Sequence, residues 1–178
     1  MPNYRRSTAV GTSYFFTVNL LERQSNDLLI REIDLLRKTV KRVNELHPFQ
    51  IDAWVVLPEH MHAVWTLPPG DCNYSQRWRL IRSLFSRALP LMETRNRVRV
   101  ARGERGIWQR RFWEHQIRND MDFAKHVDYV HINPVKHGLV ARAADWPYSS
   151  IHRYIRQGIY APDWAASPDI EMMSSGER

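Results

Sequence analysis

The chain has 178 residues, of which 26 are lysine or arginine and 19 are aspartate or glutamate, so its formal net charge is +7. This length supports one well-buried core and is too short for two ordinary domains. We therefore expect one domain over residues 1–166 and a flexible polar tail over residues 167–178. Cys72 is the one cysteine, which excludes an intramolecular disulfide and suits a reducing cytoplasm. No apolar stretch approaches about eighteen residues and no clean signal-peptide core is present, which disfavours membrane spanning and secretion.

The positive charge is concentrated in the middle of the chain. Eleven arginines lie between Arg77 and Arg111, where the acidic residues are only Glu93 and Glu104. Such a block attracts phosphate groups and makes binding salt-dependent, and arginine favours bidentate contacts and stacking on unpaired bases. The pattern predicts a nucleic-acid partner, with a solvated charged face as the alternative interpretation.

The first predicted elements are a strand and a long helix. Residues 14–20 are rich in β-forming side chains. Residues 28–46 carry apolar side chains at helical spacing, and Asn26 or Asp27 is available as the cap.

The middle of the chain predicts a hairpin, a second helix and a strand. Residues 49–56 and 60–67 form two strands around a three-residue connection. A second amphipathic helix spans about residues 74–89, and no helical stripe follows it up to residue 106. Residues 108–117 then predict a fourth strand.

A third helix is predicted over residues 120–132. Asp120 or Asp122 can cap its start, and Pro134 disfavours helical geometry at Asn133, so we expect the helix to end there. A short helix over residues 151–156 completes the chain. The order of strands and helices predicts a ferredoxin-like α+β fold. This fold is a four-stranded antiparallel sheet with two helices on one face and the other face open to the helix at 120–132.

The first chemical motif is His60-Met61-His62 on the predicted strand 60–67. Side chains alternate across a strand, so both histidines point to one face while Met61 enters the core on the other. The pair can supply half of a metal site. For an isolated pair, two half-exposed histidines on a sheet face are the favoured interpretation, so a third ligand and a nucleophile must decide.

The second motif is Tyr129 and Asn133, four residues apart on the third helix and therefore on one helical face. A phenol and an amide oxygen there can serve as nucleophile and ligand. The alternatives are a tyrosine packed at the edge of the core and an ordinary helix-ending Asn-Pro pair. We expect His126 to have a surface or supporting role and His115 to be a buried, hydrogen-bonded histidine outside the site.

Four segments, in order, resemble the REP-associated tyrosine transposases: Tyr4-Arg5-Arg6, Phe15-Phe16-Thr17-Val18-Asn19, Leu57-Pro58-Glu59-His60-Met61-His62, and Tyr129 followed by Asn133-Pro134-Val135-Lys136-His137-Gly138. That family belongs to the single-tyrosine HUH nucleases, which cut single-stranded DNA. The resemblance runs from about Tyr4 to about Trp164.

The resemblance implies the HUH nuclease fold, with His60 and His62 as metal ligands, Asn133 as the third ligand and Tyr129 as the nucleophile. Related insertion-sequence transposases often have glutamine in place of Asn133, which is one methylene shorter. Three ligands leave positions open for phosphate and water, and they are compatible with Mg²⁺ or Mn²⁺.

The implied function is that of a metal-dependent single-stranded DNA endonuclease and strand transferase that binds REP-type hairpins. Cleavage would leave a 5′-phosphotyrosine on Tyr129 and a free 3′ hydroxyl, without nucleotide hydrolysis. The resemblance suggests Arg5 and Arg6 as DNA contacts. Charge and position alone suggest five more: Arg77, Arg82, Arg110, Arg111 and Arg118.

We expect a monomer rather than a dimer that exchanges tyrosine helices, acting in the cytoplasm at the nucleoid, with no membrane or nucleotide partner. Three alternatives remain. The chain could bind DNA hairpins without cutting them, bind RNA with the same sheet, or hydrolyse phosphodiesters with activated water instead of Tyr129. The strands lack the aromatic and glycine signature of RNA-binding sheets.

Overall fold

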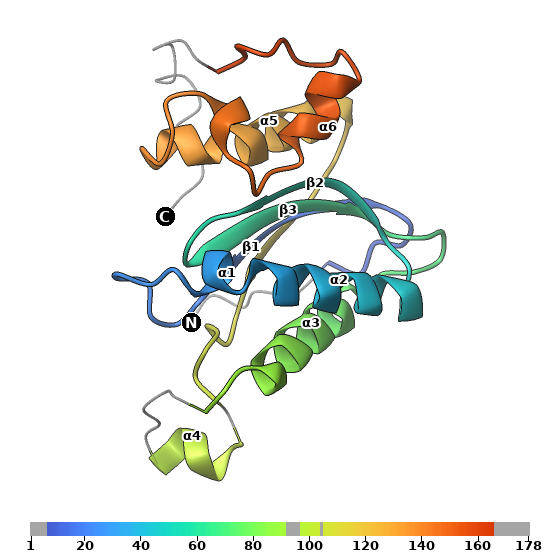
Figure 1. The fold of residues 1–178 in the computed structure, drawn as a ribbon. Helices are drawn as coiled ribbons and strands as arrows, with labels where there is room; N and C mark the ends of the chain where they lie inside the picture. Colours follow the sequence, from blue (N-terminus) through green and yellow to red (C-terminus); the bar gives the residue numbers. More distant parts are fainter. Residues whose placement is uncertain (1–6, 92–96, 104, 166–178) are drawn as a thin grey trace, which may run out of the picture.

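The computed structural model describes residues 7–91, 97–103 and 105–165 (Figure 1). Arg5, Arg6 and the predicted tail at 167–178 therefore lie outside the described residues. Within the described ranges, no helix has the length and apolar character needed to cross a membrane. In chain order the elements are β1 (Ser13–Asn19), α1 (Leu28–Arg31), α2 (Ile33–Leu46), β2 (Gln50–Val56), β3 (His60–Thr66), α3 (Tyr74–Ala88), α4 (Arg97–Ala101), β4 (Trp113–Gln116), α5 (Asp120–Lys136), the 3-10 helix η1 (Ala143–Asp145) and α6 (Ile151–Arg156).

The four strands form one antiparallel sheet in the order β2-β3-β1-β4. This order confirms the predicted ferredoxin-like α+β fold. β3 pairs with β1 so that His62 lies opposite Thr17 and His60 opposite Asn19. The motif strand is therefore central in the sheet, whereas β4 is an edge strand.

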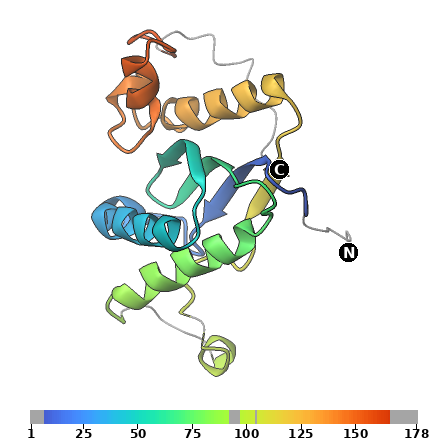
Figure 2. The same cartoon turned by 90° about the vertical axis from the view of Figure 1, so that its right-hand side faces the viewer.

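The sheet lies between two layers of helices (Figures 1 and 2). α2 and α3 pack on one face, and α5 covers β2 and β3 on the other. Alternation along β1 separates two cores: Tyr14 and Phe16 enter the core under α2 and α3, while Phe15 enters the smaller core under α5. Burying each such side chain contributes roughly 1.5–3 kcal/mol, so both faces of the sheet are held by packing.

The predicted helix over 28–46 is two helices in the structure, because Glu32 departs from helical geometry between α1 and α2. Asn26, rather than Asp27, supplies the side-chain bond at its start, accepting from the Leu28 amide at 3.0 Å. α1 is held against the hairpin connection by the bond from the Leu29 amide to the Pro58 carbonyl, 3.1 Å long. The break therefore lets α1 turn toward the end of the sheet that presents the histidine pair.

The predicted strand over 108–117 was too long, because only Trp113–Gln116 pairs continuously with β1. Trp108 makes an isolated bridge to Leu20. Between Trp108 and β4, the guanidinium of Arg82 donates a hydrogen bond of 2.7 Å to the carbonyl oxygen of Gln109. Because that carbonyl turns toward α3, the chain leaves the sheet before β4 begins. The short helix α4 was not predicted from the sequence.

α5 differs from the prediction at both ends. Its cap is Asn119, whose Oδ1 accepts from the Asp122 amide at 2.8 Å, rather than Asp120 or Asp122. At the other end the helix continues through Pro134 to Lys136 instead of stopping at Asn133. Pro134 has no N–H to donate to the carbonyl four residues earlier, but the amides that follow it keep the helix bonded: His137 donates to the Asn133 carbonyl at 3.0 Å and Leu139 to the Pro134 carbonyl at 2.9 Å.

Candidate functional site

The histidine pair lies on the face of β3 that α5 covers. His60 is 1% exposed and His62 is fully buried, so they are not the half-exposed pair of the alternative interpretation. Their ring centroids are 4.9 Å apart with the planes at 84°. Met61 points to the other core, as predicted.

Each histidine is oriented by a hydrogen bond at Nδ1. His62 Nδ1 is 2.9 Å from the hydroxyl of Thr17, which faces it across the β1–β3 ladder. His60 Nδ1 is 2.9 Å from a carboxylate oxygen of Glu59, and Arg23 donates to the same oxygen at 3.3 Å. These bonds fix both rings, so that each Nε2 is directed elsewhere.

The two Nε2 atoms are buried and have no hydrogen-bond partner among the described residues. The same holds for both polar atoms of the Asn133 side chain, which is fully buried on α5. A buried polar atom without a partner costs about 1–3 kcal/mol, so such groups in a folded protein need an explanation. Two imidazole nitrogens and an amide oxygen in this state fit the donor set of a divalent cation.

α5 brings Asn133 toward the histidines. Tyr129, one turn before Asn133, has its ring centroid 5.3 Å from that of His62. His137, one turn after Asn133, has its ring centroid 5.0 Å from that of His60. Because residues four apart lie above one another on a helix, Asn133 lies between these two contacts and faces the pair.

Tyr129 stands at the edge of this cluster. Its ring packs edge-on against Phe15 with a centroid separation of 5.7 Å, and the ammonium of Lys136 lies 4.9 Å from its ring centroid. The structure thus places His60, His62, Tyr129 and Asn133 next to one another, from elements about seventy residues apart in the sequence.

The charge states around the pair suit metal ligands. Burial, together with electrostatic interactions with His60, His137 and Lys136, keeps the pKa of His62 well below its usual range. Burial alone would raise the pKa of Glu59, but the hydrogen bonds from His60 and Arg23 lower it to about 2. At neutral pH His62 is therefore neutral and Glu59 is charged. Metal ions bind ligands in their deprotonated forms, so no proton has to leave His62 first.

Four further residues contact the side chains of this cluster, and the sequence alone assigned no role to them: Thr17, Glu59, Lys136 and His137. Lys136 is seven residues after Tyr129, and His137 is four after Asn133. That spacing would have identified both if the helix had been extended past Pro134. Thr17 could not be found in this way, because its position depends on the β1–β3 register.

The predicted DNA-contacting arginines separate into two groups. Arg77 is 3% exposed, forms an ion pair of 2.6 Å with Asp71 and donates to the carbonyls of His47 and Pro48. Its guanidinium is occupied by these partners and buried, which contradicts the predicted DNA contact and makes Arg77 a scaffold residue. Arg110, Arg111 and Arg118 are exposed, on the segments just before and after the edge strand β4.

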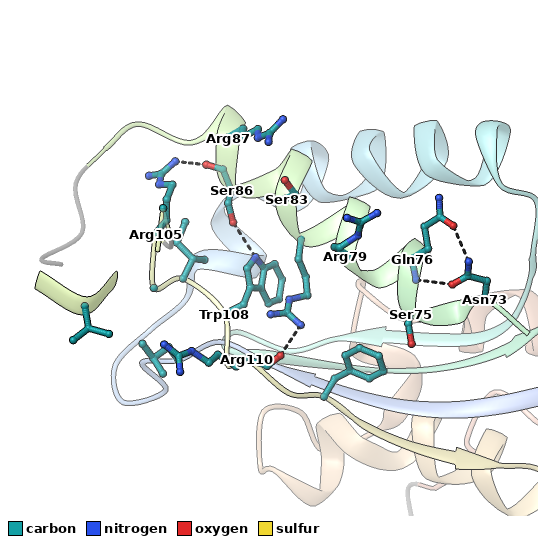
Figure 3. A pocket seen from close by; sticks show the side chains of 17 residues that line it. Asn73, Ser75, Gln76, Arg79, Ser83, Ser86, Arg87, Arg105, Trp108 and Arg110 are labelled. Carbon is teal, nitrogen blue, oxygen red and sulfur yellow. Dashed lines mark hydrogen bonds between the residues drawn. The ribbon is translucent and has the colours of Figure 1, made fainter. Parts of the chain in front are cut away.

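A groove of about 1150 Å³ lies between α3 and residues 103 and 105–112 (Figure 3). Its described lining residues include five arginines and no acidic residue: Arg79, Arg82, Arg87, Arg105 and Arg110. Trp108 belongs to its wall, because it is 8% exposed and its indole N–H donates to the Ser86 hydroxyl at 3.1 Å. The groove lies on the α3 side of the sheet, opposite the layer that contains Tyr129.

A ferredoxin-like sheet with a His-x-His pair on a central strand, set against a tyrosine-bearing helix, is the arrangement of the single-tyrosine HUH nucleases. No family model matches the sequence. A protein from Escherichia coli (strain K12) named REP-associated tyrosine transposase is 48% identical over 178 residues, covering 100% of this chain and 98% of its own. A relative from Haemophilus influenzae is 45% identical over 174 residues, covering 97% and 98%.

A solved structure of a REP-associated tyrosine transposase bound to a REP hairpin is also similar to this chain. It shares 46% identity and a TM-score of 0.82, and the match covers 100% of this chain and 98% of that one. The chain belongs to the REP-associated tyrosine transposases. This confirms the predicted family and the predicted fold.

Proposed function

We propose that this protein is a metal-dependent endonuclease and strand transferase for single-stranded DNA. In this proposal it binds REP-type hairpins and cuts beside them through a 5′-phosphotyrosine on Tyr129. The observation that carries the proposal is the set of buried, unpartnered donor atoms on His60, His62 and Asn133 next to Tyr129.

His60 Nε2, His62 Nε2 and Asn133 Oδ1 would hold Mg²⁺ or Mn²⁺, and the imidazoles suit Mn²⁺ better. Three protein ligands leave positions open, as a catalytic site requires. A cation bound there would supply Lewis-acid chemistry, polarising the scissile phosphate and neutralising charge that develops during the reaction. Thr17 and Glu59 keep the two histidines aimed at it.

Tyr129 attacks the phosphorus with its phenolic oxygen. The phenol releases its proton to solvent, a bond forms between its oxygen and phosphorus, the bond to the 3′ oxygen breaks, and the leaving 3′ oxygen takes a proton from solvent. Because the phosphotyrosine retains the energy of the broken bond, a second 3′ hydroxyl can reverse the step without a nucleotide. A phenol ionises near pH 10, and the ammonium of Lys136 over the ring favours the phenolate.

Hairpin binding is supported by the full-length similarity to a structure bound to a REP hairpin. We infer that the arginine-lined groove receives the duplex stem, because a surface of this charge fits a phosphate backbone. Arg82 and Arg110 line the groove. Arg111 comes just before β4 and Arg118 just after it, on the part of the chain that leads from the groove residues to α5. They would guide the single strand around the edge strand β4 to Tyr129, with Arg5 and Arg6 as further contacts.

We further propose that residues 1–166 act as a single domain and as a monomer in the cytoplasm at the nucleoid. The support is that one chain supplies both histidines, the tyrosine and the asparagine to the same cluster. A monomer therefore needs no partner to complete its site.

The test is covalent trapping. The protein is incubated with a labelled REP hairpin carrying a single-stranded flank, with Mn²⁺ or Mg²⁺, and then denatured. We expect a protein–DNA adduct that maps to Tyr129 and is absent in Tyr129→Phe, while hairpin binding persists. Cutting by Tyr129→Phe would instead indicate hydrolysis by water. Binding without any adduct in the wild type would indicate a hairpin-binding protein that does not cleave, and tighter binding of a matched RNA would indicate an RNA-binding module.

A further inference from the structure

A second cluster of ligand-type side chains joins β4 to the first turns of α5. His115 on β4 places Nε2 2.8 Å from one carboxylate oxygen of Asp122. His126 on α5 places Nδ1 3.1 Å from the other oxygen. Each residue offers one ligand atom, and these atoms all lie within 4.8 Å of one another. With metal–ligand bonds of about 2.0–2.2 Å, ligand atoms around one tetrahedral ion are roughly 3.3 Å apart.

This cluster is separate from the site at His60 and His62. The ring of Phe15 contacts His126 at a centroid distance of 4.9 Å and His62 at 5.6 Å, so it lies between the two groups. The side chains of His115, Asp122 and His126 are 23%, 19% and 18% exposed. An ion could therefore reach them from solvent, while most of each side chain is held in place by packing.

The charge states favour a cation. Burial lowers the pKa of His126 from its ordinary value, which leaves the imidazole neutral. Burial would raise the pKa of Asp122, but hydrogen bonds from His115 and the Arg118 amide lower it. A neutral imidazole and a charged carboxylate are the forms that bind a metal, so little proton displacement is required at neutral pH.

We propose that His115, Asp122 and His126 form a second metal site, for a transition metal such as Zn²⁺, which ties the edge strand β4 to the tyrosine helix. Two imidazoles and a carboxylate suit a transition metal better than Mg²⁺, and water completes the coordination. His126 precedes Tyr129 by three residues. An ion at this position therefore fixes the turn of α5 from which the nucleophile projects.

The metal-free arrangement already holds the ligands close together. His126 Nδ1 is 2.8 Å from the Asp122 carbonyl oxygen, and the two imidazole rings stack at 4.6 Å and 18°. Because a carbonyl only accepts, His126 Nδ1 carries the proton here, so coordination by this ring needs the other tautomer or a rotation about its outer torsion, which is a soft coordinate in histidine. The carboxylate of Asp122 is anchored by the Arg118 amide at 3.0 Å and does not have to move.

The experiment measures Zn²⁺ binding by calorimetry to untagged full-length protein without DNA. The variant His60→Ala/His62→Ala removes the other histidine pair and is expected to keep one equivalent of Zn²⁺. Adding Asp122→Asn to it should weaken that binding by about a hundredfold or more, and adding His126→Phe should do the same while preserving the ring contacts. The matched control is Asp120→Asn, which removes the same charge from the exposed first turn of α5 and should leave the affinity unchanged.

The proposal is overturned if His60→Ala/His62→Ala binds no Zn²⁺, or if its binding is insensitive to both Asp122→Asn and His126→Phe. Circular dichroism establishes that each variant is folded. If either added substitution prevents folding, X-ray absorption of Zn²⁺ bound to His60→Ala/His62→Ala decides instead: two imidazole ligands support the site, and fewer than two refute it. Because no DNA is present, failure here would leave the proposed cleavage reaction untouched.

Discussion

The ring of Tyr129 lies 5.3 Å from the ring of His62, edge to face, where α5 crosses β3. This contact joins a candidate nucleophile to a candidate metal ligand, although the two residues come from distant parts of the chain. It depends on α5 packing over the same sheet face that the histidine alternation selects. The relative positions of the two groups are therefore set by the core under α5.

The buried side chain of Asn133 should lower the free energy of unfolding of the metal-free protein. Its side chain is fully buried with no partner for either polar atom among the described residues. Replacing it by leucine, which has the same branching with methyl groups in place of the amide oxygen and nitrogen, removes this cost. We therefore expect Asn133→Leu to raise the free energy of unfolding without metal by about 1–3 kcal/mol, while abolishing Mn²⁺-dependent cleavage. Thermal unfolding with a chelator and adduct formation with Mn²⁺ measure the two effects. A less stable Asn133→Leu would show that this amide has a structural role.

Lys136 should affect the chemical step rather than binding. Its ammonium lies 4.9 Å from the ring centroid of Tyr129 and favours negative charge on the phenol. Lys136→Met should slow adduct formation by about tenfold or more, equivalent to about 1.4 kcal/mol in the barrier, with hairpin affinity nearly unchanged. Single-turnover kinetics at saturating protein separate the two quantities. Lys136→Arg should recover part of the rate, and equal rates for wild type and Lys136→Met would exclude this role.

The sequence was sufficient for features that depend on local spacing. Alternation placed His60 and His62 on one side of β3 and Met61 on the other. The spacing of four placed Tyr129 and Asn133 on one helical face. The order of strands and helices predicted the sheet. The spacing of apolar residues, and the prolines and glycines between segments, were enough to identify each strand of that sheet and the helices that pack on it.

Features that depend on pairing between distant segments, or on which partner neutralises a charge, could not be predicted from the sequence. Thr17 can orient His62 only because β1 pairs with β3 in one register. Arg77 looked like its neighbours in a basic block, yet the backbone carbonyls around residues 47 and 48 draw it inward. Pro134 was predicted to end the helix at Asn133, but α5 continues through it to Lys136, because the backbone amides after the proline still find carbonyl partners.

His131 predicts a loss of stability in acid. It is fully buried, with Nε2 2.8 Å from the Ser150 hydroxyl, which itself accepts from the Trp54 amide at 2.8 Å. Burial, with electrostatic interactions with Arg153 and His152, lowers its pKa to about 3 from 6.5. The unfolded chain therefore takes up a proton between pH 6.5 and 3 that the folded protein does not, and the folded state loses stability as the pH falls through this range.

The slope from this group is at most about 1.4 kcal/mol per pH unit. Replacing the histidine with a neutral side chain, in His131→Gln, should flatten the decline in unfolding free energy between pH 6.5 and 3. Denaturant unfolding at several pH values provides the measurement. Parallel curves for the two proteins would mean that other groups cause the acid sensitivity.

Arg77 and Arg79 are two residues apart on α3 but should behave in opposite ways. Arg77 is buried and paired with Asp71 at 2.6 Å. Arg77→Met removes the partner of Asp71 and of the His47 and Pro48 carbonyls and should lower the unfolding free energy by about 1–3 kcal/mol. Arg79 is exposed and lines the groove. Arg79→Met should leave the unfolding free energy within about 0.5 kcal/mol of wild type but weaken hairpin binding.

Salt dependence separates a phosphate contact from an indirect effect. If Arg79 contacts one backbone phosphate, Arg79→Met should reduce the slope of log affinity against log salt by about one. Arg77→Met, assayed well below its melting temperature, should keep the wild-type slope. The two variants thus serve as controls for each other in one titration series. Unchanged affinity and slope in Arg79→Met would place the hairpin stem on a different face and would remove the groove from the proposed binding surface.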